Sequence, residues 1–90
     1  MELNKLQIGQ WYRCTQYPDY PFLPLIIGTG EISKALYFNG KPDCRIQQIT
    51  NKTFWETAVE ISFDGLPENY KTNVPEEYKK PKQFIPQIFN

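Results

Sequence analysis

Apolar and polar positions alternate most clearly over residues 54–63, where every second side chain is apolar or β-branched. Trp55 and Val59 share one parity of this stretch, whereas Glu56 and Glu60 share the other. Because successive side chains of a strand point to opposite faces, the pattern predicts a strand with its odd positions buried and its glutamates in water. A helix would bring both glutamates and the apolar residues onto one stripe, which is a poor amphipathic pattern.

Two shorter apolar segments before this strand complete a predicted antiparallel meander. They occupy residues 36–38 and 44–49 and are bounded by turn-forming residues. With a three-residue loop at Asn39–Lys41, Gly40 at positive φ, and a two-residue loop at Asn51-Lys52, the apolar positions of all three strands fall on one face. This register predicts a shared core: Leu36, Phe38, Ile46, Trp55, Val59 and Ile61.

The remaining segments predict two more strands, a loop and an extension. A first strand is expected over residues 6–14 and a buried strand over residues 23–27. Residues 17–22, between them, are predicted to form a loop because their two prolines bias the preceding residues away from helix. From residue 67 onward the chain carries four prolines, and residues 75–80 have the proline, acids and lysines of a short helical turn.

These elements predict an all-β fold, either a small SH3-like barrel or a curled antiparallel sheet of about five strands, with a proline-rich C-terminal extension. Residues 1–66 are expected to form the β domain. Residues 67–90 are expected to form the extension, which packs on that domain or on a partner.

Composition narrows the class of protein. Ninety residues are enough for one domain, and ten basic side chains balance ten acidic ones, so no net field attracts nucleic acid or an acidic surface. The first residues lack the apolar segment of a signal peptide, and no apolar run approaches the ~20 residues of a membrane span. Cys14 and Cys44 could form one disulfide, but we expect a cytoplasmic protein with reduced thiols and no contact with a membrane.

The sequence contains none of the common catalytic sets. The absence of histidine removes Ser-His, Cys-His and His-metal chemistry, and two distant cysteines do not make a zinc site. On a strand, Glu56 and Glu60 would lie ~13 Å apart, too far for paired acid–base work. Residues 28–34 contain two glycines but lack the remaining features of a dinucleotide or phosphate loop. We therefore expect no enzyme activity, cofactor or metal, and no catalytic residue.

Aromatic side chains provide the best candidates for recognition. The predicted register places Glu56 and five candidate binding residues on the outer face of the meander, and their mixture resembles the composition of protein interfaces: Tyr37, Arg45, Gln47, Ile49 and Phe54. The predicted loop adds Tyr17, Tyr20 and Phe22, and aromatic-lined grooves of small barrels bind extended peptides. The alternative is that a loop or the tail covers the outer face as a second core.

The function expected from these observations is that of a non-enzymatic protein-binding module, an accessory subunit or inhibitor of the kind found among phage and mobile-element proteins. The expected partner is another protein. The alternative is a nucleic-acid-binding small β-barrel, which ranks second because stacked aromatics also need a positive groove. The apolar C-terminal residues Phe84, Ile85, Ile88 and Phe89 are expected to pack against protein, either the same copy or a second copy in a homo-oligomer.

Overall fold

The computed structural model describes residues 1–79, and its strands form a single antiparallel sheet of five in the order β4-β3-β2-β1-β5. The strands are β1 (Tyr12–Cys14), β2 (Tyr17–Ile27), β3 (Ile32–Phe38), β4 (Cys44–Ile49) and β5 (Ala58–Glu60). The helical turns are η1 (Leu3–Lys5), α1 (Thr53–Glu56), η2 (Phe63–Gly65), α2 (Glu68–Lys71) and η3 (Glu76–Tyr78). The prediction of an all-β fold built on a curled sheet is confirmed. The sheet is not closed, so β4 and β5 are its two edges.

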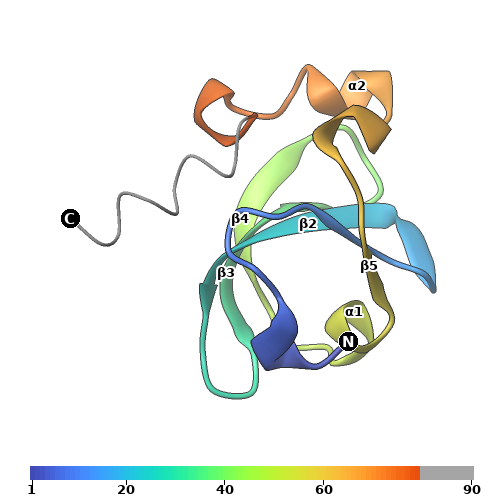
Figure 1. The fold of residues 1–90 in the computed structure, drawn as a ribbon. Helices are drawn as coiled ribbons and strands as arrows, with labels where there is room; N and C mark the ends of the chain where they lie inside the picture. The colour runs from blue at the N-terminus through green and yellow to red at the C-terminus, as the bar shows by residue number, and fades with distance from the viewer. Residues whose placement is uncertain (80–90) are drawn as a thin grey trace.

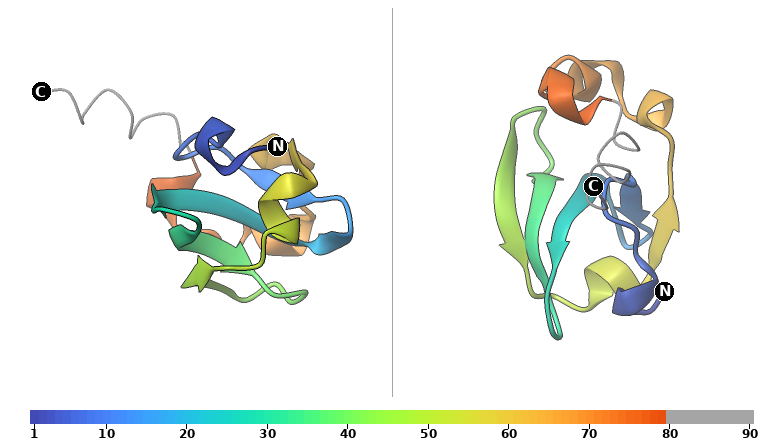
Figure 2. Two further views of the ribbon diagram at one scale, coloured as in Figure 1. Left: turned by 90° about the horizontal axis from the view of Figure 1, so that it is seen from below. Right: turned by 60° about the vertical axis from the view of Figure 1, so that its left-hand side comes forward.

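The sheet curls so that its two edge strands, β4 and β5, lie on opposite sides of the core (Figure 1). In the right-hand view of Figure 2, β4, β3 and β2 lie on one side of the molecule and β5 lies on the other. α1 lies at one end, and the helical turns of residues 63–78 lie at the opposite end.

The central strands separate two hydrophobic clusters because neighbouring residues on β2 and β3 are buried on opposite faces. Phe22 pairs with Tyr37 on one face, and Leu23 pairs with Leu36 on the other. The first core consists of Leu6, Tyr12, Cys14, Phe22, Ile32, Ala35, Ile49, Phe54, Trp55 and Ala58. The second core consists of Trp11, Leu23, Leu36, Phe38, Leu66, Tyr70 and Val74.

The predicted long strand over residues 54–63 is wrong, because its first part forms α1. The side-chain oxygen of Asn51 accepts a hydrogen bond from the Thr53 amide at 3.0 Å. The main-chain carbonyl of Asn51 accepts one from the Phe54 amide, also at 3.0 Å. Asparagine favours such local bonds over a strand ladder, so the Asn51-Lys52 segment starts a helical turn instead of a hairpin.

The strand that follows α1 also has a different partner from the one expected. β5 pairs with β1, through Arg13 with Val59 and Cys14 with Ala58, and it does not pair with β4. On this short edge strand Val59 faces outward beside the exposed Arg13 and is 39% exposed, contrary to the prediction. Ile61, also predicted to be buried, is half-buried beyond the end of β5, whereas Trp55 is buried as part of α1.

The β3–β4 hairpin keeps the predicted face but not the predicted loop. Leu36 pairs with Ile46 and Phe38 pairs with Cys44, so the loop comprises residues 39–43 and is longer than the expected three residues. Because the register differs by two residues, the same side chains still share one face.

For two residues of this hairpin, the backbone conformation or the burial can be compared with the prediction. Gly40 adopts a φ of 84°, in the left-handed region expected of it. Ile46, in contrast, is 54% exposed although it was predicted to be buried. It lies on the edge strand β4, and the second core takes in its neighbour Cys44 but does not extend to it.

The segment predicted as a loop, Tyr17–Phe22, is instead the first half of β2. Pro18 and Pro21 fall where the register of β1 and β2 shifts, between the pairs Cys14–Tyr17 and Tyr12–Phe22. Proline is compatible with a strand at such irregular positions because no ladder bond is required of it there. The first strand is shorter than predicted, since only Tyr12–Cys14 of the expected residues 6–14 form β1 and Gly9, with a φ of 85°, lies in a turn before it.

Residues 63–78 cover the second core, and they include most of the described part of the predicted extension. Leu66, Tyr70 and Val74 are buried at intervals of four residues, and the Tyr70 ring stacks on that of Phe38 with centroids 4.4 Å apart. The Tyr70 hydroxyl donates a hydrogen bond to the carbonyl of Asp19 at 3.2 Å. The short helical turn predicted over residues 75–80 is confirmed as η3. The four apolar tail residues lie outside the described part of the chain.

This arrangement predicts that the segment after β5 is integral to folding. Leu66 is only 3% exposed, so Leu66→Ala should lower the free energy of unfolding by about 2–5 kcal/mol. Ile46→Ala, at an exposed position, should lower it by less than about 1 kcal/mol. Urea denaturation of the two variants tests this, and equal effects would contradict the second core.

Candidate functional site

Four aromatic side chains surround that of Phe54. Its ring centroid lies 5.6 Å from that of Tyr17, 5.8 Å from Tyr37, 6.2 Å from Phe22 and 6.3 Å from Tyr20. We call these five residues the aromatic cluster. The structure therefore unites the aromatic residues that the sequence analysis assigned to two separate places, the meander and the loop.

Three elements hold the cluster together. β2 supplies Tyr17, Tyr20 and Phe22, β3 supplies Tyr37 opposite Phe22, and α1 supplies Phe54. The rings meet in mixed geometry, with Tyr17 stacked on Phe54 at 23° and Tyr20 edge-on to it at 82°. Offset and edge-on pairs of this kind each contribute about 0.5–1.5 kcal/mol beyond area burial, so the tyrosines are held in fixed positions.

Burial divides the cluster into a base and a surface. Phe22 is fully buried and Phe54 is 9% exposed, whereas Tyr17 is 41% exposed and Tyr20 and Tyr37 are half-buried. The two phenylalanines therefore support three tyrosines that reach solvent. Tyrosine at such a surface offers an apolar ring together with a hydroxyl that can donate and accept hydrogen bonds.

A shallow hollow of about 190 Å³ lies beside the cluster. It is lined by side chains without formal charge: Tyr37, Gln47, Gln48, Ile49, Thr50, Asn51 and Phe54. Amide and hydroxyl groups next to aromatic rings can form hydrogen bonds with the main-chain N–H and C=O groups of a peptide. The lining carries no positive charge with which to hold a phosphate.

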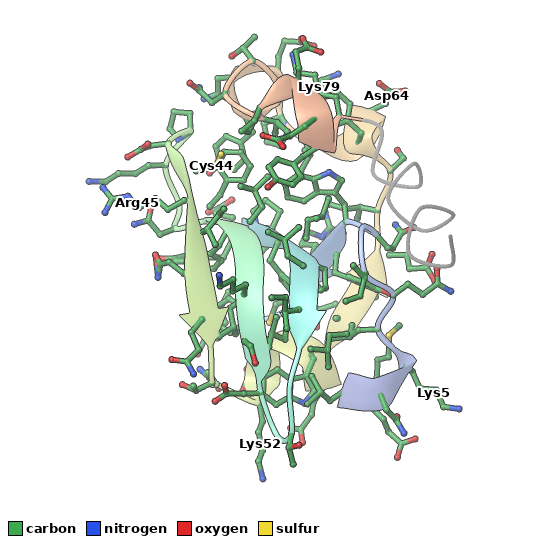
Figure 3. The ribbon with its side chains drawn as sticks, turned by 90° about the vertical axis from the view of Figure 1, so that its left-hand side faces the viewer. Lys5, Cys44, Arg45, Lys52, Asp64 and Lys79 are labelled. Atoms are coloured by element: carbon green, nitrogen blue, oxygen red, sulfur yellow. The ribbon has the colours of Figure 1, made fainter. Side chains whose placement is uncertain are left out.

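The remaining predicted site residues take different places. Gln47 is exposed and lines the hollow, and Ile49 is buried in the first core. Arg45 opposes Tyr37 across the β3–β4 pair, but its side chain extends away from the sheet (Figure 3) and contacts Asp43 at 3.4 Å. The alternative that the outer face forms a core is thus correct for Ile49 and for most of Phe54, but not for Arg45 or Gln47.

Sequence reasoning missed the three polar residues that complete the hollow, Gln48, Thr50 and Asn51. Asn51 did give a turn signal, but the consequence drawn from it was a hairpin. The helical turn that begins there instead places Phe54 against Tyr17 and Tyr20.

The glycine in the β3–β4 loop also shapes the cluster. A Cβ atom at Gly40 would lie 3.4 Å from the ring of Tyr20, and the backbone there has a positive φ. Tyr20 in turn lies 6.2 Å from Tyr37 between ring centroids. The loop therefore closes against one side of the cluster.

The ionisable groups of this region favour neutral recognition. Burial, and secondarily the neighbouring Tyr20, raise the pKa of Tyr37, so its hydroxyl is a hydrogen-bond donor at neutral pH. Burial, followed by the charge of Asp43, likewise raises the pKa of the Cys44 thiol, which disfavours the nucleophilic thiolate. The other thiol, Cys14, is buried with its Sγ atom 3.0 Å from Thr57 Oγ1, and no disulfide joins the two cysteines.

Within residues 1–79, no group of three or more histidine, cysteine, aspartate or glutamate side chains could hold a metal ion. None of the helices in this described range has the length and apolar character needed to span a bilayer. Comparison with protein-family models, with curated proteins and with solved structures finds no match.

Phe54 should be a structural residue as well as the base of the cluster. Because its ring contacts four other aromatic rings, Phe54→Ala should lower the free energy of unfolding by about 3–5 kcal/mol. Phe54→Leu, which keeps most of the apolar volume, serves as the control and should cost less. Thermal unfolding monitored by near-ultraviolet circular dichroism measures both, and an unchanged Phe54→Ala melting temperature would remove Phe54 from the core.

The raised pKa values of the tyrosines predict a loss of stability in alkali. Burial raises the pKa of Tyr12, Tyr37, Tyr70 and Tyr78, so the folded state holds these protons more tightly than the unfolded state does. The contribution of these tyrosines to stability should be constant below pH ~10, the pKa of an unperturbed tyrosine, and should be lost as the pH rises above that value. Absorbance at 295 nm, compared with the urea-unfolded chain, should show delayed ionisation. Coincident curves would contradict the prediction.

Proposed function

We propose that this chain is a non-enzymatic protein-binding module of the SH3-like barrel type, which binds an extended segment of another protein at the aromatic cluster. The strand count, the short chain and the curl of the sheet support the barrel type. The observation that carries the function is the set of three solvent-reaching tyrosines next to an uncharged hollow. Grooves lined by aromatic side chains are a recurrent means of binding extended peptides.

A module of this kind would act by occupying its partner, as an accessory subunit or an inhibitor does. A cytoplasmic location belongs to the same proposal. Nucleic acid is the less favoured partner, because binding a single strand requires a positive groove as well as stacking platforms. The hollow has no charged lining, and the nearby Arg45 already contacts Asp43.

Two uncharged synthetic peptides test this proposal in nuclear magnetic resonance titrations of the labelled protein. One alternates threonine with valine and tyrosine, and the other is a proline-rich peptide with two tyrosines. At least one should shift the amide signals of Tyr17, Tyr37 and Phe54 in a saturable manner. If neither peptide shifts them, binding of extended segments at the cluster is wrong.

A pair of matched variants locates the binding. Gln47→Glu places a charge in the hollow, where covering by a peptide would desolvate it, and should weaken binding by about tenfold. Gln7→Glu makes the same change at an exposed position outside the hollow and should leave affinity unchanged. Equal effects would place the peptide elsewhere. Fluorescently labelled single-stranded DNA should not bind, and binding with a steep salt dependence would favour the nucleic-acid alternative.

A further inference from the structure

The outer edge of β4 has no partner strand in the described part of the chain. β4 pairs only with β3, and none of the described hydrogen bonds joins its main chain to another element. In an antiparallel pair, every second residue directs its N–H and C=O groups away from the neighbouring strand. Figure 3 shows β4 as the outermost strand of the sheet, with Arg45 extending beyond it.

This edge lacks the usual protection against pairing with another chain. Edge strands are commonly blunted by charges, prolines, bulges or extreme shortness. β4 pairs with β3 residue for residue from Cys44 to Gln47, and the register shift before Ile49 places its extra residue on β3. β4 carries Arg45 as its one charged side chain and exposes Ile46. The opposite edge of the sheet, β5, is only three residues long and ends at Glu60. Of the two edges, β4 is therefore the one suited to accept a strand.

The same strand borders the hollow. Gln47, Gln48 and Ile49 of β4 line it together with Tyr37 and Phe54. A strand laid along β4 would run past this hollow, and side chains on one of its faces would point toward the aromatic cluster. The neutral lining favours a peptide whose inward side chain is aromatic or apolar.

We infer that the partner segment is an uncharged, strand-forming peptide, which adds to the free edge of β4 and places one aromatic or apolar side chain in the hollow. This inference rests on the proposed protein-binding function and specifies how the segment binds. Main-chain hydrogen bonds to β4 supply affinity that does not depend on peptide sequence, and the hollow supplies the preference for the inward side chain.

A second copy of the protein fits this edge less well than a peptide. If β4 paired with β4 of another copy in the register that opposes Ile46 to itself, the two Arg45 side chains would be diagonal neighbours of like charge, offset only by the exposed contact of each with Asp43. On the face of the hollow, the second copy would offer Arg45 and Gln47, neither of which is aromatic or apolar.

The test uses the wild-type protein and an uncharged peptide in which threonine alternates with valine and a central tyrosine. Two derivatives carry N-methyl groups on alternate amides, one on the odd positions and one on the even positions. An added strand donates to β4 from one set only, so one derivative should bind at least about tenfold more weakly than the other. Alternate β4 amides should also become protected from hydrogen exchange when the unmethylated peptide binds.

Two matched protein variants complete the experiment. Ile46→Glu adds a charge at the free edge and should weaken binding of the peptide by about tenfold. Ile26→Glu makes the same change at a similarly exposed isoleucine in β2, 48% exposed against 54% for Ile46, and should leave the affinity unchanged.

Different failures have different meanings. If the peptide shifts the signals of the aromatic cluster while both methylated derivatives bind equally and no β4 amide gains protection, edge pairing is overturned and peptide binding at the cluster stands. If no peptide binds, both proposals are overturned. If the unliganded protein is a dimer that Ile46→Glu dissociates, the edge belongs to a second copy, and the inference of a peptide partner is wrong.

Discussion

β2 and β3 bury side chains on both of their faces, and the rest of the chain is arranged to cover them. Neither face can be left to water, because each carries a row of large apolar or aromatic residues. α1 and the N-terminal residues cover one face, and residues 63–78 cover the other. Within residues 1–79, most segments outside the sheet therefore serve to cover one of its two faces.

The need to cover both faces of the sheet explains where the candidate site lies. A residue that covers a core must face inward, yet Tyr17, Tyr20 and Tyr37 sit at the margin of the first core and keep part of each side chain in solvent. The largely buried ring of Phe54 contacts these tyrosines, so the contacts that hold α1 on the sheet also pre-organise the recognition surface. Pre-organised side chains lose little conformational entropy when a ligand binds.

The sequence predicted the fold class, the faces of the β3–β4 hairpin and the special conformation of Gly40, because each depends on local chemistry. Alternation fixes which side chains share a face, and only glycine adopts a positive φ without strain. The prediction of a strand from Phe54 onward was wrong. The buried residues of this segment, Phe54, Trp55 and Ala58, have the spacing of a helical turn. Local bonds from Asn51 decided between the two periods, and alternation alone could not.

Sequence reasoning could not predict which elements lie next to one another in the folded protein. The exposure of Ile46 depends on β4 being an edge, and the partner of β5 depends on the curl of the whole sheet. The aromatic cluster likewise depends on α1, which places Phe54 against the aromatic residues of β2. The types of its residues were recognisable in advance, whereas their assembly at one place was a tertiary property.

The contact between Gly40 and Tyr20 also sets limits on engineering of this protein. Surface loops are the usual places for inserted tags or fluorescent labels, and the β3–β4 loop has the length of a convenient one. A larger residue there would strain the backbone and press on a ring of the aromatic cluster, so an insertion would alter the surface it was meant to report on. Gly30, in the turn between β2 and β3, also has a positive φ, of 77°, but a Cβ atom there would meet no atom within 4 Å, so a substitution would strain only the local backbone. A probe attached at that turn would leave the tyrosines undisturbed.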